Sequence, residues 1–404
     1  MATEEEIQGQ IARLQSYLQM DPENIPLQLD IADLQHSAGQ FMEAERSFNH
    51  VLTKQPGHEV ASARLANVFI SQLRFGEAEG ILRSLTVDSA EAPVLNHNLG
   101  IALVYQNRWE EALEALQRAS EGGVVDAENS FFKAYCLANL ERREEAMVMA
   151  ASALDDNVDD YLRGKVGLFQ LEMGAIDLAA KTCEKLIQRQ PRNIDANVVM
   201  ASWNLEQQEI DSAERQINIV LDQAPNNPIA LLGRALVQMY NQQTVKAIAT
   251  FERTLALTPR AVGTWVALAW AHYANNDLVK AEAVFKKTLE IDRTFGEAHG
   301  GLAVIYALTA RVEEARAAIA RGKGLNQNSF GAAFAVSILL QQEGKAEVGA
   351  RILTAAFRKS PVEDGLTVFE ALRKYLQRQA DVRGGAKPPP NRGPVKSQNV
   401  LMRF

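Results

Sequence analysis

Small and apolar residues recur along this 404-residue chain with a period of 34 positions. Counted from residues 25, 59, 93, 127, 160, 194, 228, 262, 296 and 330, the twentieth position holds alanine nine times and glycine once. The eighth position is always alanine, glycine or serine, and the twenty-fourth is always apolar. The starts at 127 and 160 are only 33 residues apart, so one position is missing there. A period of this length predicts a repeat array.

The same pattern predicts two crossing helices in each repeat. Helices approach closely only where side chains are small, so the eighth and twentieth positions mark the crossing. The apolar residue at the twenty-fourth position lies one turn further along the same face of the second helix. Asn24, Asn193 and Asn227 stand where a side chain can cap a first helix. We therefore predict an all-α fold with ten helix-turn-helix repeats over residues 25–362.

The pattern resembles the tetratricopeptide repeat, W-x2-L-G-x2-Y…A-x3-F…P, over about 25–363. It is clearest in the third repeat (Leu99, Gly100, Ala112, Leu116) and the eighth (Trp265, Leu268, Ala269, Ala281, Phe285). The resemblance implies an α-solenoid that forms a right-handed superhelix and binds other proteins. Lys133 and Arg234, at the seventh position of their repeats, depart from the family pattern. The resemblance specifies architecture and no chemistry.

The segments outside the repeats are predicted to differ from one another. Residues 1–24 should hold an N-terminal capping helix, and 363–380 a C-terminal one, because terminal repeats must shield the exposed core. Residues 381–404 are rich in proline and basic, and we expect them to be disordered. Their apolar end could dock on a protein or be a frayed terminus. The residues of this possible docking segment are Leu401, Met402, Arg403 and Phe404.

Charge is spread unevenly along the chain. The net charge is −8, and residues 383–404 hold five basic residues and no acid, so the remainder is at −13. An acidic body argues against a nucleic-acid surface, and no nucleic-acid partner is expected. The basic segment is an alternative candidate for contact with anionic surfaces. We find no secretory leader, no long apolar run and only two cysteines, so we expect a cytoplasmic protein without a transmembrane segment.

The first helices should line the concave surface of the stack. Their fifth, ninth and twelfth positions share one face, and in repeats 6–10 this face is mostly apolar, which predicts a groove for an amphipathic helix or an extended peptide. Alternatively, curvature buries these residues against neighbouring repeats, or the chain's own C-terminus covers them. The predicted partner-binding groove comprises Val198, Leu232, Leu236, Met239, Val266, Trp270, Tyr273, Val304, Phe334 and Ile338.

One subgroup of the family binds peptide C-termini through a clamp of two asparagines and three cations. Asn67 and Asn98 match the asparagines, but Ala63, Glu128 and Phe132 stand where cations belong, so the clamp is predicted to be absent. We find no phosphate loop and no metal-ligand spacing, and Cys136 and Cys183 lack a histidine partner. The sequence therefore predicts a non-enzymatic protein with no cofactor and no metal.

The function that fits these observations is a protein-interaction scaffold or adaptor that holds a peptide or helix of a protein partner. The array loosely resembles bacterial repeat proteins that serve in the assembly of secretion, pilus or polysaccharide systems. The alternative is a chaperone-like holder of an apolar segment of an exported or membrane protein. Both would use the same kind of surface, and the sequence does not name the partner.

Overall fold

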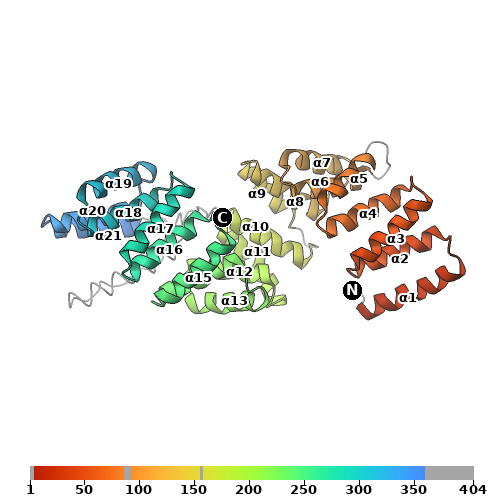
Figure 1. The fold of residues 1–404 in the computed structure, drawn as a ribbon, viewed down its shortest axis with the longest axis horizontal. Helices are drawn as coiled ribbons and strands as arrows, with labels where there is room; N and C mark the ends of the chain where they lie inside the picture. The colour runs from red at the N-terminus through yellow and green to blue at the C-terminus, as the bar shows by residue number, and fades with distance from the viewer. Residues whose placement is uncertain (1–3, 86–91, 155–157, 360–404) are drawn as a thin grey trace. The chain divides into compact units, whose positions relative to one another are not determined.

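The computed structural model describes residues 4–85, 92–154 and 158–359, and every regular element in them is an α-helix (Figure 1). The helix predicted for 363–380 and the basic segment with Leu401, Met402, Arg403 and Phe404 lie outside the described residues. A helix does lie at the predicted N-terminal position, α1 (Glu4–Met20). The all-α prediction is confirmed. No described helix is both long enough and apolar enough to cross a lipid bilayer.

The chain forms two compact units, residues 1–158 and 159–404. Their boundary falls where the 34-residue period loses one position, between the starts at 127 and 160. After α1, the first unit contains four helix pairs: α2 (Ile25–Ser37), α3 (Phe41–Lys54), α4 (Glu59–Ser71), α5 (Phe75–Leu85), α6 (Ala92–Val104), α7 (Trp109–Glu121), α8 (Ala127–Asn139) and α9 (Arg143–Ser152).

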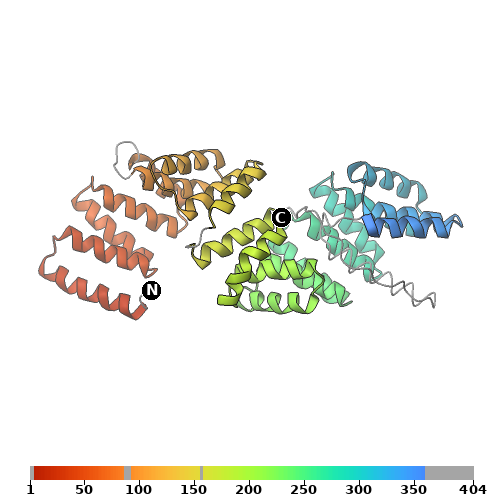
Figure 2. The ribbon, with the colours of Figure 1, turned by 180° about the vertical axis from the view of Figure 1, so that it is seen from behind.

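The second unit contains six further pairs, seen from the opposite side in Figure 2. The pairs are α10 (Asp160–Glu172), α11 (Ile176–Arg189), α12 (Ile194–Glu206), α13 (Ile210–Gln223), α14 (Pro228–Tyr240), α15 (Thr244–Leu257), α16 (Val262–Ala274), α17 (Leu278–Ile291), α18 (Gly296–Leu308), α19 (Val312–Leu325), α20 (Phe330–Gln342) and α21 (Ala346–Lys359).

The turn inside each pair has the same backbone geometry in all ten repeats. The residue at the fifteenth position of the repeat has a positive φ in all ten repeats, from Gly39 (φ 72°) to Gly344 (φ 76°). Seven of these ten residues are not glycine. In the first repeat the Gly39 N–H donates to the His36 carbonyl and the Gln40 N–H to the Gln35 carbonyl, both at 2.9 Å. These two bonds satisfy the last carbonyls of the first helix, as in a Schellman turn. One turn type therefore joins the two helices of every repeat.

The three predicted asparagine caps are confirmed. Asn24, Asn193 and Asn227 each accept a hydrogen bond from the backbone N–H three residues on, at 3.0, 3.0 and 2.9 Å. Each bond satisfies one of the N–H groups that the first turn of a helix leaves without a partner. These caps give several first helices a defined start that the sequence alone specifies.

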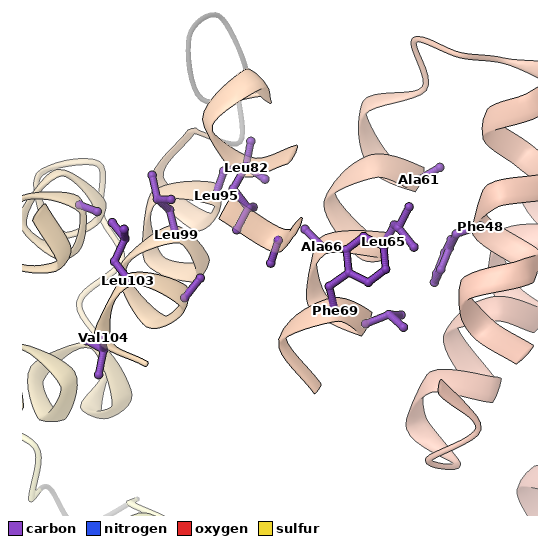
Figure 3. Packing of buried hydrophobic residues seen from close by; sticks show 14 of the residues in the cluster. Phe48, Ala61, Leu65, Ala66, Phe69, Leu82, Leu95, Leu99, Leu103 and Val104 are labelled. Atoms are coloured by element: carbon purple, nitrogen blue, oxygen red, sulfur yellow. The ribbon is translucent and has the colours of Figure 1, made fainter. Parts of the chain in front are cut away.

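The small residues lie at helix crossings, as predicted. A Cβ atom added to Gly100 would lie 2.5 Å from Leu116, and one added to Gly167 would lie 2.3 Å from Cys183. The eighth position is therefore small because the side chain at the twenty-fourth position occupies the space above it. The same packing continues through the first unit, where Figure 3 shows buried apolar side chains of α3 to α6 forming one core.

Candidate functional site

The residues predicted to line an apolar groove are core residues in the structure. Of the ten, nine are buried and Tyr273 is half-buried. Trp270 has no exposed surface, and it packs in one cluster with residues of α18 and α20, including Val304 and Phe334. Leu232, Leu236 and Met239 belong to the core around α14 to α16, and Val198 to the core around α12 to α14. These side chains are therefore packed in the repeat cores, which is the alternative that the sequence left open, and their role in partner binding stays a prediction.

At the last two repeats this burial comes with a very close approach of the first helices α18 and α20. A Cβ added to Gly300 would lie 2.7 Å from the backbone nitrogen of Ala332, and one added to Gly331 would lie 2.5 Å from the backbone of Gly300. The backbones of α18 and α20 therefore touch, which only glycine permits. At the same contact the buried Glu297 carboxylate accepts bonds of 2.8 Å from the Ser329 hydroxyl and the Gly331 N–H. This packing leaves no open channel between these two helices.

In the first unit the first-helix face is more exposed and more polar. Asn98 donates a hydrogen bond of 2.8 Å to the side-chain oxygen of Asn67, and Arg64 forms an ion pair with Asp33. The two asparagines that match the peptide-C-terminus clamp are thus bonded to each other. Glu128, in a position where the clamp has a cation, is exposed and lies 3.6 Å from His97. This arrangement does not favour binding of a carboxylate.

A groove of about 970 Å³ lies between second helices α7 and α9 of the first unit, with α8 beneath it. We call it the α7–α9 groove. Its apolar residues include Val148, whose side chain is 64% exposed although it is aliphatic. The apolar lining is Leu113, Leu137, Leu140, Val148 and Met149, and the polar and charged lining is Glu110, Glu114, Gln117, Arg118, Glu121, Lys133, Arg142, Glu144 and Glu145.

The charges around this groove are unbalanced. Five glutamates face three basic residues, and Arg142 is already paired with Glu145 at 2.7 Å. Exposed Glu110, Glu114 and Glu144 form no ion pair with the described residues. The groove is therefore apolar inside and negative around its edge, which suits an apolar segment with positive charges on its flanks.

Lys133 lines this groove with a charged side chain. Its ammonium group donates to the Ser120 hydroxyl at 2.5 Å and lines the groove. Burial lowers the pKa of Lys133, and nearby Glu121 acts in the opposite direction. A charged group cannot be packed under a second helix without a cost in solvation, so a lysine at this position favours a gap beside it. The helix above it, α9, has only 10 residues, whereas α7 has 13.

Comparison with known proteins identifies the repeat. Two family models, each described as a tetratricopeptide repeat, match the chain, one over residues 274–335 and the other over 97–161, 204–260 and 234–294. The chain is a tetratricopeptide-repeat protein. Tetratricopeptide repeats are protein-binding architecture, so the chain is a protein-interaction scaffold in this general sense. No curated protein matches it.

Solved structures with similar folds are distant from this tetratricopeptide-repeat protein. The APC/C hetero-tetramer Cut9–Hcn1 is 10% identical, and the match covers 92% of this chain and 83% of that chain with a TM-score of 0.45. The human IFIT1 dimer with m7Gppp-AAAA is 16% identical, and the match covers 83% of this chain and 90% of that chain with a TM-score of 0.45. A thermophilic tetratricopeptide-repeat protein from Thermus thermophilus is 20% identical, and the match covers 43% of this chain and 95% of that chain with a TM-score of 0.39. These likenesses are too distant to support an argument about function.

Sequence reasoning missed the α7–α9 groove because it examined only the first helices. Two signals were present in the fourth tetratricopeptide repeat. Lys133 breaks the apolar pattern of the first helix, and Val148 places an apolar residue on a face of the second helix that is otherwise charged. Lys133 is a charged residue at a position where the repeat pattern is apolar, and Val148 is an apolar residue at a position where the helix face is charged. Two such departures close together indicate an open surface.

Histidines and acids do not form a metal site in the part of the chain that the structure describes. His97 and His272 are both buried, with 7% and 5% exposed. Burial works to lower the pKa of His97, but the hydrogen bond to Glu128 and the charge of Asp126 outweigh it and raise that pKa. Burial lowers the pKa of His272. Both rings are structural parts of the repeat packing.

The two cysteines give a direct test of this packing. Both are free and buried, and burial raises the pKa of Cys136 and of Cys183 to about 12. At pH 8 only about one thiol in ten thousand would then be a thiolate, the reactive form. We expect an aromatic disulfide reagent to label neither cysteine in the native protein and both after denaturation. Fast labelling of either one in the native state would show that its repeat is not packed as described.

Proposed function

We propose that this chain is a non-enzymatic adaptor that holds a basic, amphipathic segment of a partner protein in the α7–α9 groove. The observation that supports the proposal is an apolar groove edged by glutamates without ion pairs. A helix or extended peptide with apolar residues on one side could place them against Leu113 and Val148, and its lysines or arginines near Glu110 and Glu144. All residues that line the groove belong to the first unit, so a partner could bind there without a rearrangement of the helices.

A partner would bind the α7–α9 groove of the first unit at a lower energetic cost than the groove predicted from the sequence in the second unit. Binding at Leu236 or Trp270 would require the packed first helices to separate and their buried apolar surface to be exposed before the partner arrives. Each large apolar side chain contributes roughly 1.5–3 kcal/mol through burial, so such an opening is costly. The α7–α9 groove is already open, and Val148 is already in solvent.

Neutralising the edge of the groove should weaken binding. We expect the triple variant Glu110→Gln/Glu114→Gln/Glu144→Gln to bind a fluorescent helical peptide of leucine and lysine about tenfold more weakly than the wild type, since each exposed charge pair contributes about 0.2–1 kcal/mol. The wild-type affinity should also fall as salt is added. Fluorescence anisotropy with the full chain measures both effects.

A matched control separates the groove from net charge. Glu184, Glu214 and Glu252 are exposed glutamates on second helices of the second unit, and replacing all three by glutamine changes the net charge by the same amount. This control variant should bind the peptide as the wild type does. Equal weakening by both triple variants would mean that the peptide responds only to overall charge, and the proposed function would be wrong.

A second candidate function is the holding of an apolar segment of an exported or membrane protein. The apolar lining of the groove, with Leu137, Leu140 and Met149 beneath Val148, favours it. Binding of that kind would depend little on salt and would survive neutralisation of the glutamates, so the same measurement separates the two functions. A role in the assembly of a bacterial secretion, pilus or polysaccharide system stays a prediction from the architecture. We propose a cytoplasmic location, because free cysteines suit a reducing compartment.

A further inference from the structure

Four repeats have an arginine at their sixteenth position, directly before the second helix. In three of them this arginine binds a glutamate at the twenty-first position of the preceding repeat, which links the second helices of successive repeats. The Arg108 guanidinium, for example, donates through Nε and Nη2 to Glu111 in the first turn of its own helix, and through Nη1 to Glu79 of the preceding repeat at 2.6 Å. The three linking pairs are Glu45 with Arg74, Glu79 with Arg108 and Glu282 with Arg311.

The fourth repeat lacks this link, and the break lies in the α7–α9 groove. The position that would supply the glutamate holds Leu113, and both Leu113 and Arg142 line the groove. Arg142 donates to Glu145 through Nε and Nη2, both at 2.7 Å, as Arg108 does to Glu111. Its Nη1 group, which in Arg108 binds the preceding repeat, donates to none of the residues that the structure describes. Two N–H groups of a charged side chain are therefore free to bind a ligand in the groove.

We propose that Arg142 binds a glutamate or aspartate side chain of the partner segment, which takes the place of the carboxylate that the third repeat lacks. This inference rests on the proposed function, because it adds one acid to the basic, amphipathic segment that the groove holds. A guanidinium presents its N–H groups as a planar fork, and Arg108 binds two carboxylates at once with it. The acid of the partner lies beside the apolar residue that contacts Leu113, because Leu113 stands where the missing glutamate would be.

The net charge of the groove makes such a contact selective. Five glutamates and three basic residues line the groove, so an acid at most positions along a bound segment is repelled. An acid that meets Arg142 is the exception, since direct hydrogen bonds to a charged group offset the repulsion there. A segment with its one acid in the correct register should therefore bind more tightly than the same segment without that acid.

Peptides with a single acid test the contact. The probes are amidated, fluorescent helical peptides of leucine and lysine with one glutamate at successive polar positions, each matched with a peptide that has glutamine there. Amidation removes the C-terminal carboxylate. We expect the glutamate peptide of one register to bind the wild-type full chain about twofold to fivefold more tightly than its glutamine partner, the range that an exposed charge pair gives. In Arg142→Gln this preference should disappear.

Matched variants separate the role of Arg142 from the charge of the groove, with the ratio of the two peptide affinities as the readout. Arg118 is exposed and also lines the groove, so Arg118→Gln removes the same charge and should leave the ratio unchanged. Leu113→Glu supplies the missing glutamate of the link, so it should occupy Arg142 and abolish the preference. Gln117→Glu adds the same negative charge one turn further along α7 and should keep it.

The outcomes distinguish this inference from the proposed function. If the peptides bind the groove, as shown by weakening in the triple glutamate-to-glutamine variant, but no register prefers glutamate, this inference is overturned and the proposed function stands. The same holds if Arg142→Gln and Arg118→Gln reduce the preference equally, or if Leu113→Glu keeps it. If the triple variant weakens no peptide, both are overturned.

Discussion

Replacing Gly300 or Gly331 by alanine is expected to lower the free energy of unfolding of the second unit by about 2–3 kcal/mol, the upper part of the range for overpacking a core. The added methyl group would lie 2.5–2.7 Å from atoms of the facing helix, including backbone atoms that cannot rotate away. Helices α18 and α20 would have to separate and lose the bonds of Glu297 to Ser329 and Gly331. Chemical denaturation followed by far-ultraviolet circular dichroism measures the loss.

Gly263 provides the control for these two variants. It lies in α16, is exposed, and a Cβ added to it would have no neighbour within 4 Å. The change Gly263→Ala should therefore stabilise the protein by up to about 1 kcal/mol, because alanine loses less backbone entropy in a helix. If Gly300→Ala were as harmless as Gly263→Ala, the close contact of α18 and α20 would not exist in solution.

The change Trp270→Ala is expected to cost about 3–5 kcal/mol, the usual cost of removing a large aromatic side chain from a core. Trp270 has no exposed surface, and its ring meets Phe285 at 5.3 Å and Tyr273 at 5.6 Å in edge-on geometry. The cavity would lie beside Phe285 of α17 and Phe330 of α20, so the second unit should unfold at a lower denaturant concentration than in the wild type. The shift of the denaturation midpoint measures the effect.

The change Trp270→Phe separates packing from polarity. The Trp270 indole nitrogen is buried without a hydrogen-bond partner, and a buried N–H that lacks a partner costs roughly 1–3 kcal/mol. Phenylalanine removes this N–H but leaves a smaller cavity, so the two effects should nearly cancel, to within about 1 kcal/mol. If Trp270→Phe destabilised the protein as much as Trp270→Ala does, the indole N–H would have to be bonded.

A partner-binding test should use substitutions of exposed residues, because substitutions of buried ones unfold the protein. Charge substitutions in the predicted groove, such as Leu236→Glu or Trp270→Glu, would each bury a carboxylate without a partner. Loss of a partner from such variants would report unfolding. Exposed glutamates at the α7–α9 groove test binding without disturbing the core, because Glu110, Glu114 and Glu144 are already in water.

The burial of the predicted groove residues has a reason that a single repeat does not contain. On an isolated helix pair, Val266 and Trp270 lie on a face with no neighbour, and an apolar face without a neighbour indicates a binding surface. Whether later pairs cover that face depends on how the first helices pack. Here Gly300 and Gly331 bring α18 and α20 into contact, and the Trp270 ring lies 6.1 Å from the ring of Phe330 in α20. The run Gly300–Gly301 was visible in the sequence, but its contact lies one repeat away.

The sequence by itself determined the repeat, its two helices, their caps and the crossing points. All of these depend on interactions within about 34 residues, such as Asn193 with the start of its own helix or Gly100 with Leu116. Only the tertiary structure decided which faces are open, because exposure depends on how closely successive repeats pack. That packing buried Trp270 in the second unit and left Val148 in solvent beside Lys133 in the first.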